Sequence, residues 1–119
     1  MRLSGLILAL FMSASAVNAD DDMPIMTVGY YLHAFGAKNS SEQLQVVSYL
    51  SGIRDHIYWQ CKYKVTVRNL IDASNLMIAA SRTTYHNAEF VEWANKTPYG
   101  DMVFVGIKAN PPNGTMKCS

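Results

Sequence analysis

The stretch 40–61, SSEQLQVVSYLSGIRDHIYWQC, constrains the fold more than any other part of the chain. Its apolar residues recur at steps of three and four, the spacing that places side chains on one side of a helix. These residues are Val46, Leu50, Ile53, Ile57 and Cys61. Ser40, followed three residues later by Gln43, forms a capping-box pattern at the start. The pattern therefore predicts a long core helix that carries a cysteine on its buried side.

Gly52 stands in the middle of this predicted helix, where a glycine costs about 1 kcal/mol relative to alanine. We interpret it as a point where another backbone packs closely against the helix. Asp55 follows one turn later and is expected to accept hydrogen bonds from the start of a neighbouring helix or from a loop. The two residues therefore indicate a close helix crossing.

Residues 1–19 have the form of a bacterial secretory signal peptide. Arg2 precedes an apolar run at 6–12, and the small residues at 17–19 form a cleavage pattern. The run is too short to span a bilayer, although an uncleaved membrane anchor is the alternative interpretation. Cleavage after Ala19 would leave residues 20–119 in the periplasm, without a membrane span and with the usual size of one domain.

The chain has two cysteines, Cys61 and Cys118, and both follow the predicted cleavage site. In an oxidising compartment an even pair normally forms a disulfide. Closing a loop of nearly sixty residues would stabilise the fold by about 4 kcal/mol in the chain-entropy model. A reactive or metal-binding thiol would need a resolving cysteine or close histidines, and only His56 is near either cysteine in sequence. We therefore expect a structural disulfide.

Helical spacing continues on both sides of the central stretch. A first helix is expected over 23–35, with Pro24 in its first turn and Gly36 in the left-handed position after its end. Thr66 is a candidate N-cap for a third helix, and helical spacing returns at 88–95.

The last helix is the least clear from the sequence. Thr97 and Pro98 form a helix-start signal, yet 102–107 is continuously apolar and rich in β-branched residues. We expect a helix there, with a buried strand as the alternative. The chain as a whole is predicted to be all-α: a small single-domain bundle of four to five helices with one disulfide.

The charged and reactive residues give no sign of catalysis. Loss of Arg2 would leave nine basic against nine acidic residues, and no basic cluster stands out beyond 62–64, so nucleic acid is not an expected partner. His33, His56 and His86 are separated by 23 and 30 residues, a spacing that indicates no metal-ligand set. No activated nucleophile or carboxylate pair is evident. We therefore expect a protein that is not an enzyme and that uses no cofactor.

The segment 49–55, Tyr-Leu-Ser-Gly-Ile-Arg-Asp, resembles the aromatic-apolar-x-Gly-apolar-x-Asp helix of small periplasmic immunity proteins for type VI secretion amidase effectors. In that family a cysteine, a short linker and a second amphipathic helix follow, and a terminal cysteine closes the chain. Cys61, residues 62–65, residues 65–72 and Cys118 occupy these places here. The resemblance marks Tyr49, Gly52 and Asp55 as a helix-packing motif.

The resemblance implies an inhibitor with no chemistry of its own, which would block the active site of a peptidoglycan-cleaving amidase delivered by sister cells. A loop expected at 82–87 would offer Arg82, Tyr85 and His86 as partner contacts, although an ordinary connection is the alternative. The many aromatic residues suit either a core or a protein-binding face.

Three further interpretations stay open at this point. A general periplasmic chaperone or stress-binding module would have the same size and disulfide. A small lipid- or ligand-binding helical domain would require a well-formed apolar cavity. The chain could also pair with a second copy of itself as a homodimer.

Overall fold

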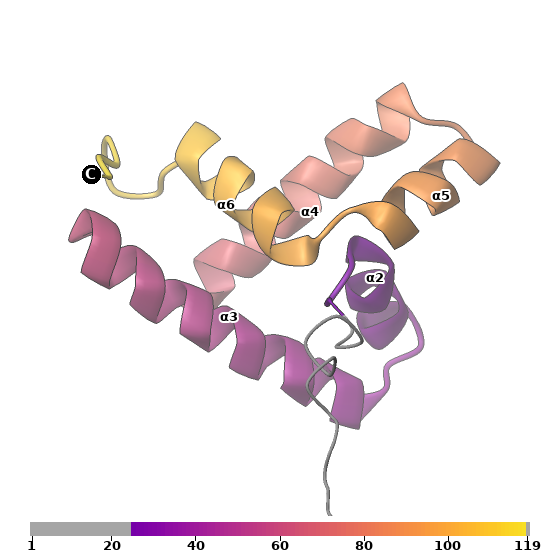
Figure 1. The fold of residues 1–119 in the computed structure, drawn as a ribbon, viewed down its shortest axis with the longest axis horizontal. Coiled ribbons are helices and arrows are strands. Elements are labelled where there is room, and N and C mark those ends of the chain that lie inside the picture. Colours follow the sequence, from indigo (N-terminus) through magenta and orange to yellow (C-terminus); the bar gives the residue numbers. More distant parts are fainter. Residues whose placement is uncertain (1–24, 119) are drawn as a thin grey trace, which may run out of the picture.

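Five α-helices follow one another over residues 25–118, the part of the chain that the computed structural model describes (Figure 1). They are α2 (Val28–Gly36), α3 (Ser40–Cys61), α4 (Val67–Thr84), α5 (Ala88–Lys96) and α6 (Tyr99–Ala109). This range contains no strand, and an isolated bridge joins Thr27 to Pro98. The predicted all-α fold is confirmed, and residues 102–107 are helical. The predicted signal peptide lies outside the described residues.

Figure 1 shows α3 along one side of the molecule and α4, α5 and α6 together on the other. The helix α2 lies between α5 and the N-terminal end of α3 and packs against both. The most extensive packing joins α4 to α6, and α2 also contacts α6.

The apolar stripe of α3 faces this core, as its spacing predicts. Val46, Leu50 and Ile57 are fully buried, and Ile53 and Cys61 pack partly buried beside them. The helix α6 buries residues over a wider part of its circumference, because α4 and α2 both cover it. Its buried residues are Tyr99, Met102, Val103, Gly106 and Ile107. Because α6 is buried over so much of its circumference, segment 102–107 is continuously apolar. A buried strand would have the same pattern, and for this reason the sequence alone left both interpretations open.

A close helix crossing lies at Gly106 but not at Gly52. A Cβ at Gly106 would lie 2.8 Å from Cγ of Met77 and 3.2 Å from the backbone oxygen of Ala73, so α6 needs a glycine where it meets α4. A Cβ at Gly52 would meet no atom within 4 Å. The prediction of close packing at Gly52 is therefore wrong.

Asp55 does not bind the start of α4. Its carboxylate is exposed and pairs with Arg54 at 3.1 Å. The start of α4 has its own capping box. Thr66 Oγ1 accepts from the Asn69 backbone N–H at 3.0 Å, and Asn69 Oδ1 accepts from the Thr66 backbone N–H at 3.0 Å. Because these donors are already satisfied, Asp55 is not needed there.

The first helix begins at Val28, later than predicted, because the residues before it pair with the start of α6. The backbone N–H of Val28 donates to the Thr97 oxygen at 3.0 Å, and the N–H of Tyr99 donates to the Met26 oxygen at 2.8 Å. Thr27 then caps α2 by accepting from the Tyr30 N–H. A helix through 25–27 would lose these bonds between distant segments.

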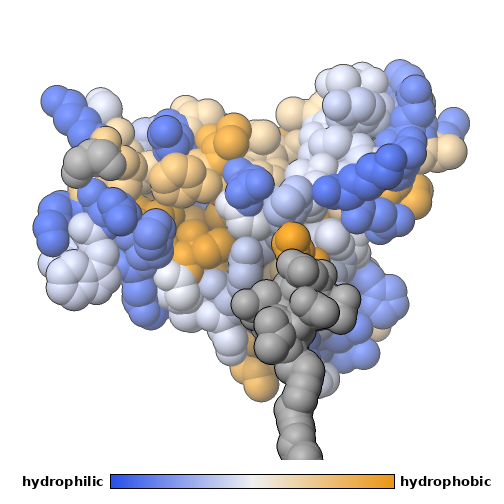
Figure 2. All heavy atoms as spheres, in the orientation of Figure 1, coloured by the Kyte–Doolittle hydropathy of each residue, from blue (hydrophilic) through white to orange (hydrophobic). Residues whose placement is uncertain are grey.

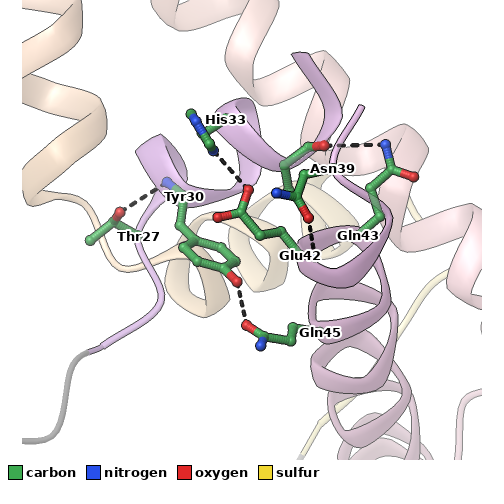
Figure 3. A network of polar contacts seen from close by, with 8 residues as sticks. Thr27, Tyr30, His33, Asn39, Glu42, Gln43 and Gln45 are labelled. Carbon is green, nitrogen blue, oxygen red and sulfur yellow. Dashed lines mark hydrogen bonds and ion pairs between the residues drawn. The ribbon is translucent and has the colours of Figure 1, made fainter. Parts of the chain in front are cut away.

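Polar contacts join α2 to α3 across a short turn (Figure 3). The N-cap of α3 is Asn39, one residue before the predicted cap, and Lys38 takes the left-handed conformation expected at Gly36, with φ 55°. His33 Nδ1 lies 2.7 Å from Glu42 Oε1, and Gln43 donates to the Ala34 oxygen at 3.1 Å. These bonds join the C-terminal half of α2 to the first turn of α3.

A hydrogen-bonded pair lies inside the apolar core. Ser74 and Tyr99 are both fully buried, and their hydroxyl oxygens are 2.8 Å apart. Ser74 donates to the Leu70 oxygen at 2.7 Å, so the Tyr99 hydroxyl donates to Ser74. The Tyr31 ring stacks on Tyr99 with centroids 4.7 Å apart. Burial raises the pKa of Tyr99 far above its ordinary value and also raises the pKa of Tyr31.

The predicted disulfide joins Cys61 to Cys118 and holds the C-terminal segment against the end of α3. Tyr63 adds a second attachment, since its hydroxyl accepts from the Asn113 N–H at 2.6 Å and donates to the Gly114 oxygen at 3.1 Å. The C-terminal segment is therefore tied at two places, to the last residue of α3 and to the α3–α4 connection.

Candidate functional site

An apolar groove of about 680 Å³ lies between α3 and α6; we call it the α3–α6 groove. Figure 2 shows hydrophobic side chains gathered in this hollow. The lining residues are Ser48, Tyr49, Gly52, Ile53, His56, Gly100, Asp101, Phe104 and Val105. Gly52 leaves the α3 wall open, and Gly100 makes room for Tyr49, whose hydroxyl oxygen would lie 2.6 Å from a Cβ at that position. The glycine predicted to admit another helix thus borders an open groove.

A second hollow of about 400 Å³, the α4–α6 hollow, lies on the other side of α6. It is lined by Met77, Ser81, Thr84, Tyr85, Trp93, Thr97, Asp101, Met102 and Val105. Asp101 and Val105 line both hollows and thus form a ridge on α6 between them. Val105 is 54% exposed although it belongs to the apolar run of α6. Two apolar depressions therefore adjoin along one ridge.

The predicted partner contacts Arg82, Tyr85 and His86 come together at the corner between α4 and α5, around a hollow of about 470 Å³. The expectation of a loop over 82–87 is wrong for its first half, since α4 continues to Thr84 and places Arg82 in its last turn. In this turn the Arg82 guanidinium lies 4.2 Å from the centre of the Phe90 ring of α5.

Aromatic stacking stabilises the same corner, and one residue in it has a strained backbone conformation. Tyr85 stacks on Trp93 with ring centroids 5.9 Å apart, and it lines the α4–α6 hollow as well as the corner hollow. Asn87 has φ 51°, a left-handed value that a side chain disfavours. Because neighbouring hollows share Tyr85, Asp101 and Val105, the three depressions form one continuous face, which we call the α6 surface.

The charges on the α6 surface are few. Asp101 is exposed, in the first turn of α6, and makes no ion pair with any residue of 25–118. His56 lies across the α3–α6 groove and is also exposed. Beyond Trp93, Glu92 pairs with Lys96 at 2.8 Å, and the hydrogen bond from Lys96 lowers the pKa of that carboxyl.

A fourth hollow of about 500 Å³ lies at the disulfide end, and both charged and aromatic side chains line it. Asp55 lines it beside Arg54, so the third residue of the predicted packing motif lies away from the α6 surface. Trp59 borders it with 73% of its surface exposed, and the Lys62 ammonium lies 5.0 Å from its ring centre.

Within residues 25–118, no group of three or more histidine, cysteine, aspartate or glutamate side chains could hold a metal ion. None of the helices described there is long and apolar enough to cross a membrane. The α6 surface offers apolar and aromatic contact area, with the Asp101 carboxylate on its ridge and Arg82 at its corner.

Arg82, Tyr85 and His86 lie around one hollow, as their nearness in the sequence predicts, whereas the groove and the ridge were not predicted. The sequence did contain a signal for the ridge. When 99–109 is treated as a helix, Val105 lies outside the side that carries the other apolar residues, so an exposed apolar side chain is expected there. No family model, curated protein or solved structure matches this chain.

Proposed function

We propose that the protein is a periplasmic immunity protein that binds a peptidoglycan-cleaving amidase effector of type VI secretion and inhibits it sterically. The α6 surface carries this proposal, because exposed apolar and aromatic side chains border three adjoining hollows. Surfaces of this kind bind protein partners through anchors that enter pockets. The class of partner rests on the resemblance of segment 49–55, and three residues of that segment, Tyr49, Gly52 and Ile53, line the α3–α6 groove.

A steric inhibitor benefits from a contact element that is already ordered, because less conformational entropy is lost on binding. The α4–α5 corner meets this requirement. Arg82 lies on the Phe90 ring and Tyr85 stacks on Trp93, so both candidate contact residues are held before any partner arrives. We propose that this corner enters the amidase active site while the rest of the α6 surface packs around its rim.

The test is co-expression of the full chain with candidate amidase effectors, beginning with any that is encoded beside its gene, measuring cell lysis and co-purification. Val105→Asp should lose protection and weaken binding by at least about thirtyfold, the effect of a hot-spot residue. Leu76→Asp is the matched control, since Leu76 is 57% exposed against 54% for Val105 but lines none of the hollows described above. If the wild type neither binds nor protects, the proposal fails.

The apolar lining of the α3–α6 groove also fits the second candidate, a periplasmic chaperone that binds many partly unfolded clients. Such a protein would suppress aggregation of unrelated reduced or heated substrates at near-equimolar ratio, and Val105→Asp would abolish that suppression. An immunity protein should leave such aggregation unchanged. This assay separates the two functions without any amidase.

A further inference from the structure

Asp101 occupies an unusual position on the α6 surface. It lines both the α3–α6 groove and the α4–α6 hollow, and it is the only carboxylate among the described residues that lines either. His56 is the only basic side chain found in those linings, and no described residue forms an ion pair with Asp101. The ridge thus presents one negative charge that the described part of the fold does not neutralise.

Apolar walls flank this charge on both sides. Tyr49, Ile53 and Phe104 line the α3–α6 groove, while Met77, Trp93 and Met102 line the α4–α6 hollow. A partner that filled both hollows would exclude water from the ridge, and an ion pair shielded in this way is stronger than one exposed to solvent. The same partner would lose affinity if it left the carboxylate unpaired, because a buried charge without a partner is costly.

We infer that the ridge of Asp101 and Val105 receives a partner segment in which a lysine or arginine stands between two bulky apolar side chains. The basic group pairs with the Asp101 carboxylate, and the apolar side chains enter the α3–α6 groove and the α4–α6 hollow. Arginine suits the site best, since its planar guanidinium binds a carboxylate through two parallel hydrogen bonds. This inference rests on the proposed function, because it describes the segment through which the bound partner protein would contact the ridge.

Asp101 also has a structural role that must be separated from recognition. An acidic residue in the first turn of a helix stabilises the helix N-terminus, and Asp101 lies in the first turn of α6. Asp101→Asn removes this contribution and the charge together, so thermal stability and binding have to be measured on the same variant. Asp72→Asn is the matched control: it removes an exposed carboxylate of α4 that pairs with Arg68 and lines none of the hollows described above.

The experiment presents the full chain with immobilised short peptides that carry Arg, Lys, Ala or Glu between two Leu or Phe residues at varied spacing. The wild type should bind Arg-centred peptides at least about tenfold more tightly than Glu-centred ones at the best spacing, as expected for a shielded, charge-assisted hydrogen bond. Asp101→Asn should remove this preference, Asp101→Lys should reverse it, and Asp72→Asn should retain it.

Equal binding of Arg- and Glu-centred peptides, or a preference that survives Asp101→Asn, overturns the inference. So does self-association of the wild type that Val105→Asp abolishes, because a second copy would then cover the ridge. Since the peptide assay contains no amidase, its failure is distinguishable from failure of the proposed function. If Asp101→Asn binds the amidase as the wild type does, the proposed function stands and the inference fails. If the protein prefers Arg-centred peptides but does not bind the amidase, the inference stands and the proposed function fails.

Discussion

Replacing Ser74 by alanine removes the acceptor of a hydroxyl group in the centre of the core. Tyr99 is fully buried, and its hydroxyl makes its one hydrogen bond with a described residue to Ser74, at 2.8 Å. A buried polar group left without a partner costs about 1–3 kcal/mol. The lost bond from Ser74 to the Leu70 oxygen adds little, because such bonds back to the preceding helical turn are close to neutral for helix stability. We therefore expect Ser74→Ala to lower the free energy of unfolding by about 1–3 kcal/mol.

Tyr99→Phe should cost less, about 0.5–1.5 kcal/mol, since Ser74 keeps its bond to Leu70 and the ring keeps its stacking on Tyr31. The double variant leaves no buried hydroxyl unpaired. Its loss of stability should therefore be smaller than the sum of the two single losses, as a double-mutant cycle would measure.

The assay is urea unfolding with linear extrapolation, supported by thermal unfolding, in which 1 kcal/mol corresponds to about 4–8 °C for a domain of 60–100 residues. Ser51→Ala is the control, because the Ser51 hydroxyl donates to the Val47 oxygen at 3.0 Å in the same way but is only partly buried and bonds no tyrosine. A Ser74→Ala variant as stable as Ser51→Ala, or strictly additive losses in the cycle, would refute the reasoning.

Three further predictions concern stability. Cys61→Ser should lower the free energy of unfolding by about 2–5 kcal/mol in urea, and titration of the non-reduced wild type should find no reactive thiol. Gly106→Val should cost about 1–3 kcal/mol because it overpacks the contact with α4, whereas Gly52→Ala should add about 0.5–1 kcal/mol because its Cβ meets open space; thermal unfolding compares the two. Burial keeps Tyr99 and Tyr31 protonated in the native state while unfolded tyrosines ionise near pH 10, so stability should fall as pH rises above that value. For Tyr99 the slope reaches up to about 1.4 kcal/mol per pH unit, and urea midpoints measured against pH for the wild type and Tyr99→Phe test it.

Features that depend on neighbouring residues followed from the sequence. The helix predicted at 40–61, the cap at Thr66, and the helix predicted at 88–95 agree with the structure, because periodicity and caps are local properties, although the cap of α3 is Asn39 and not Ser40. The pairing of Cys61 with Cys118 was also predictable, since the chain has no other cysteine. The signal peptide, the periplasmic location and the amidase partner stay predictions.

Features that depend on distant segments did not follow. The first helix starts at Val28 because the residues before it pair with the start of α6, and nothing local to residues 25–27 indicates this pairing. The glycine at a helix crossing proved to be Gly106, while Gly52 borders a groove. A sequence shows that a helix lacks a side chain at one position, but only packing shows whether another helix occupies the space.

The α6 surface illustrates the same division. The sequence determined that the chain builds helices with apolar stripes, that a disulfide closes it, and that Arg82, Tyr85 and His86 lie near one another. Only the tertiary structure decided that α3 and α4 lie on opposite sides of α6 and leave a hollow on each side. The ridge of Asp101 and Val105 exists for that reason, because a surface shared by three helices depends on their relative positions and not on the residues of any one of them.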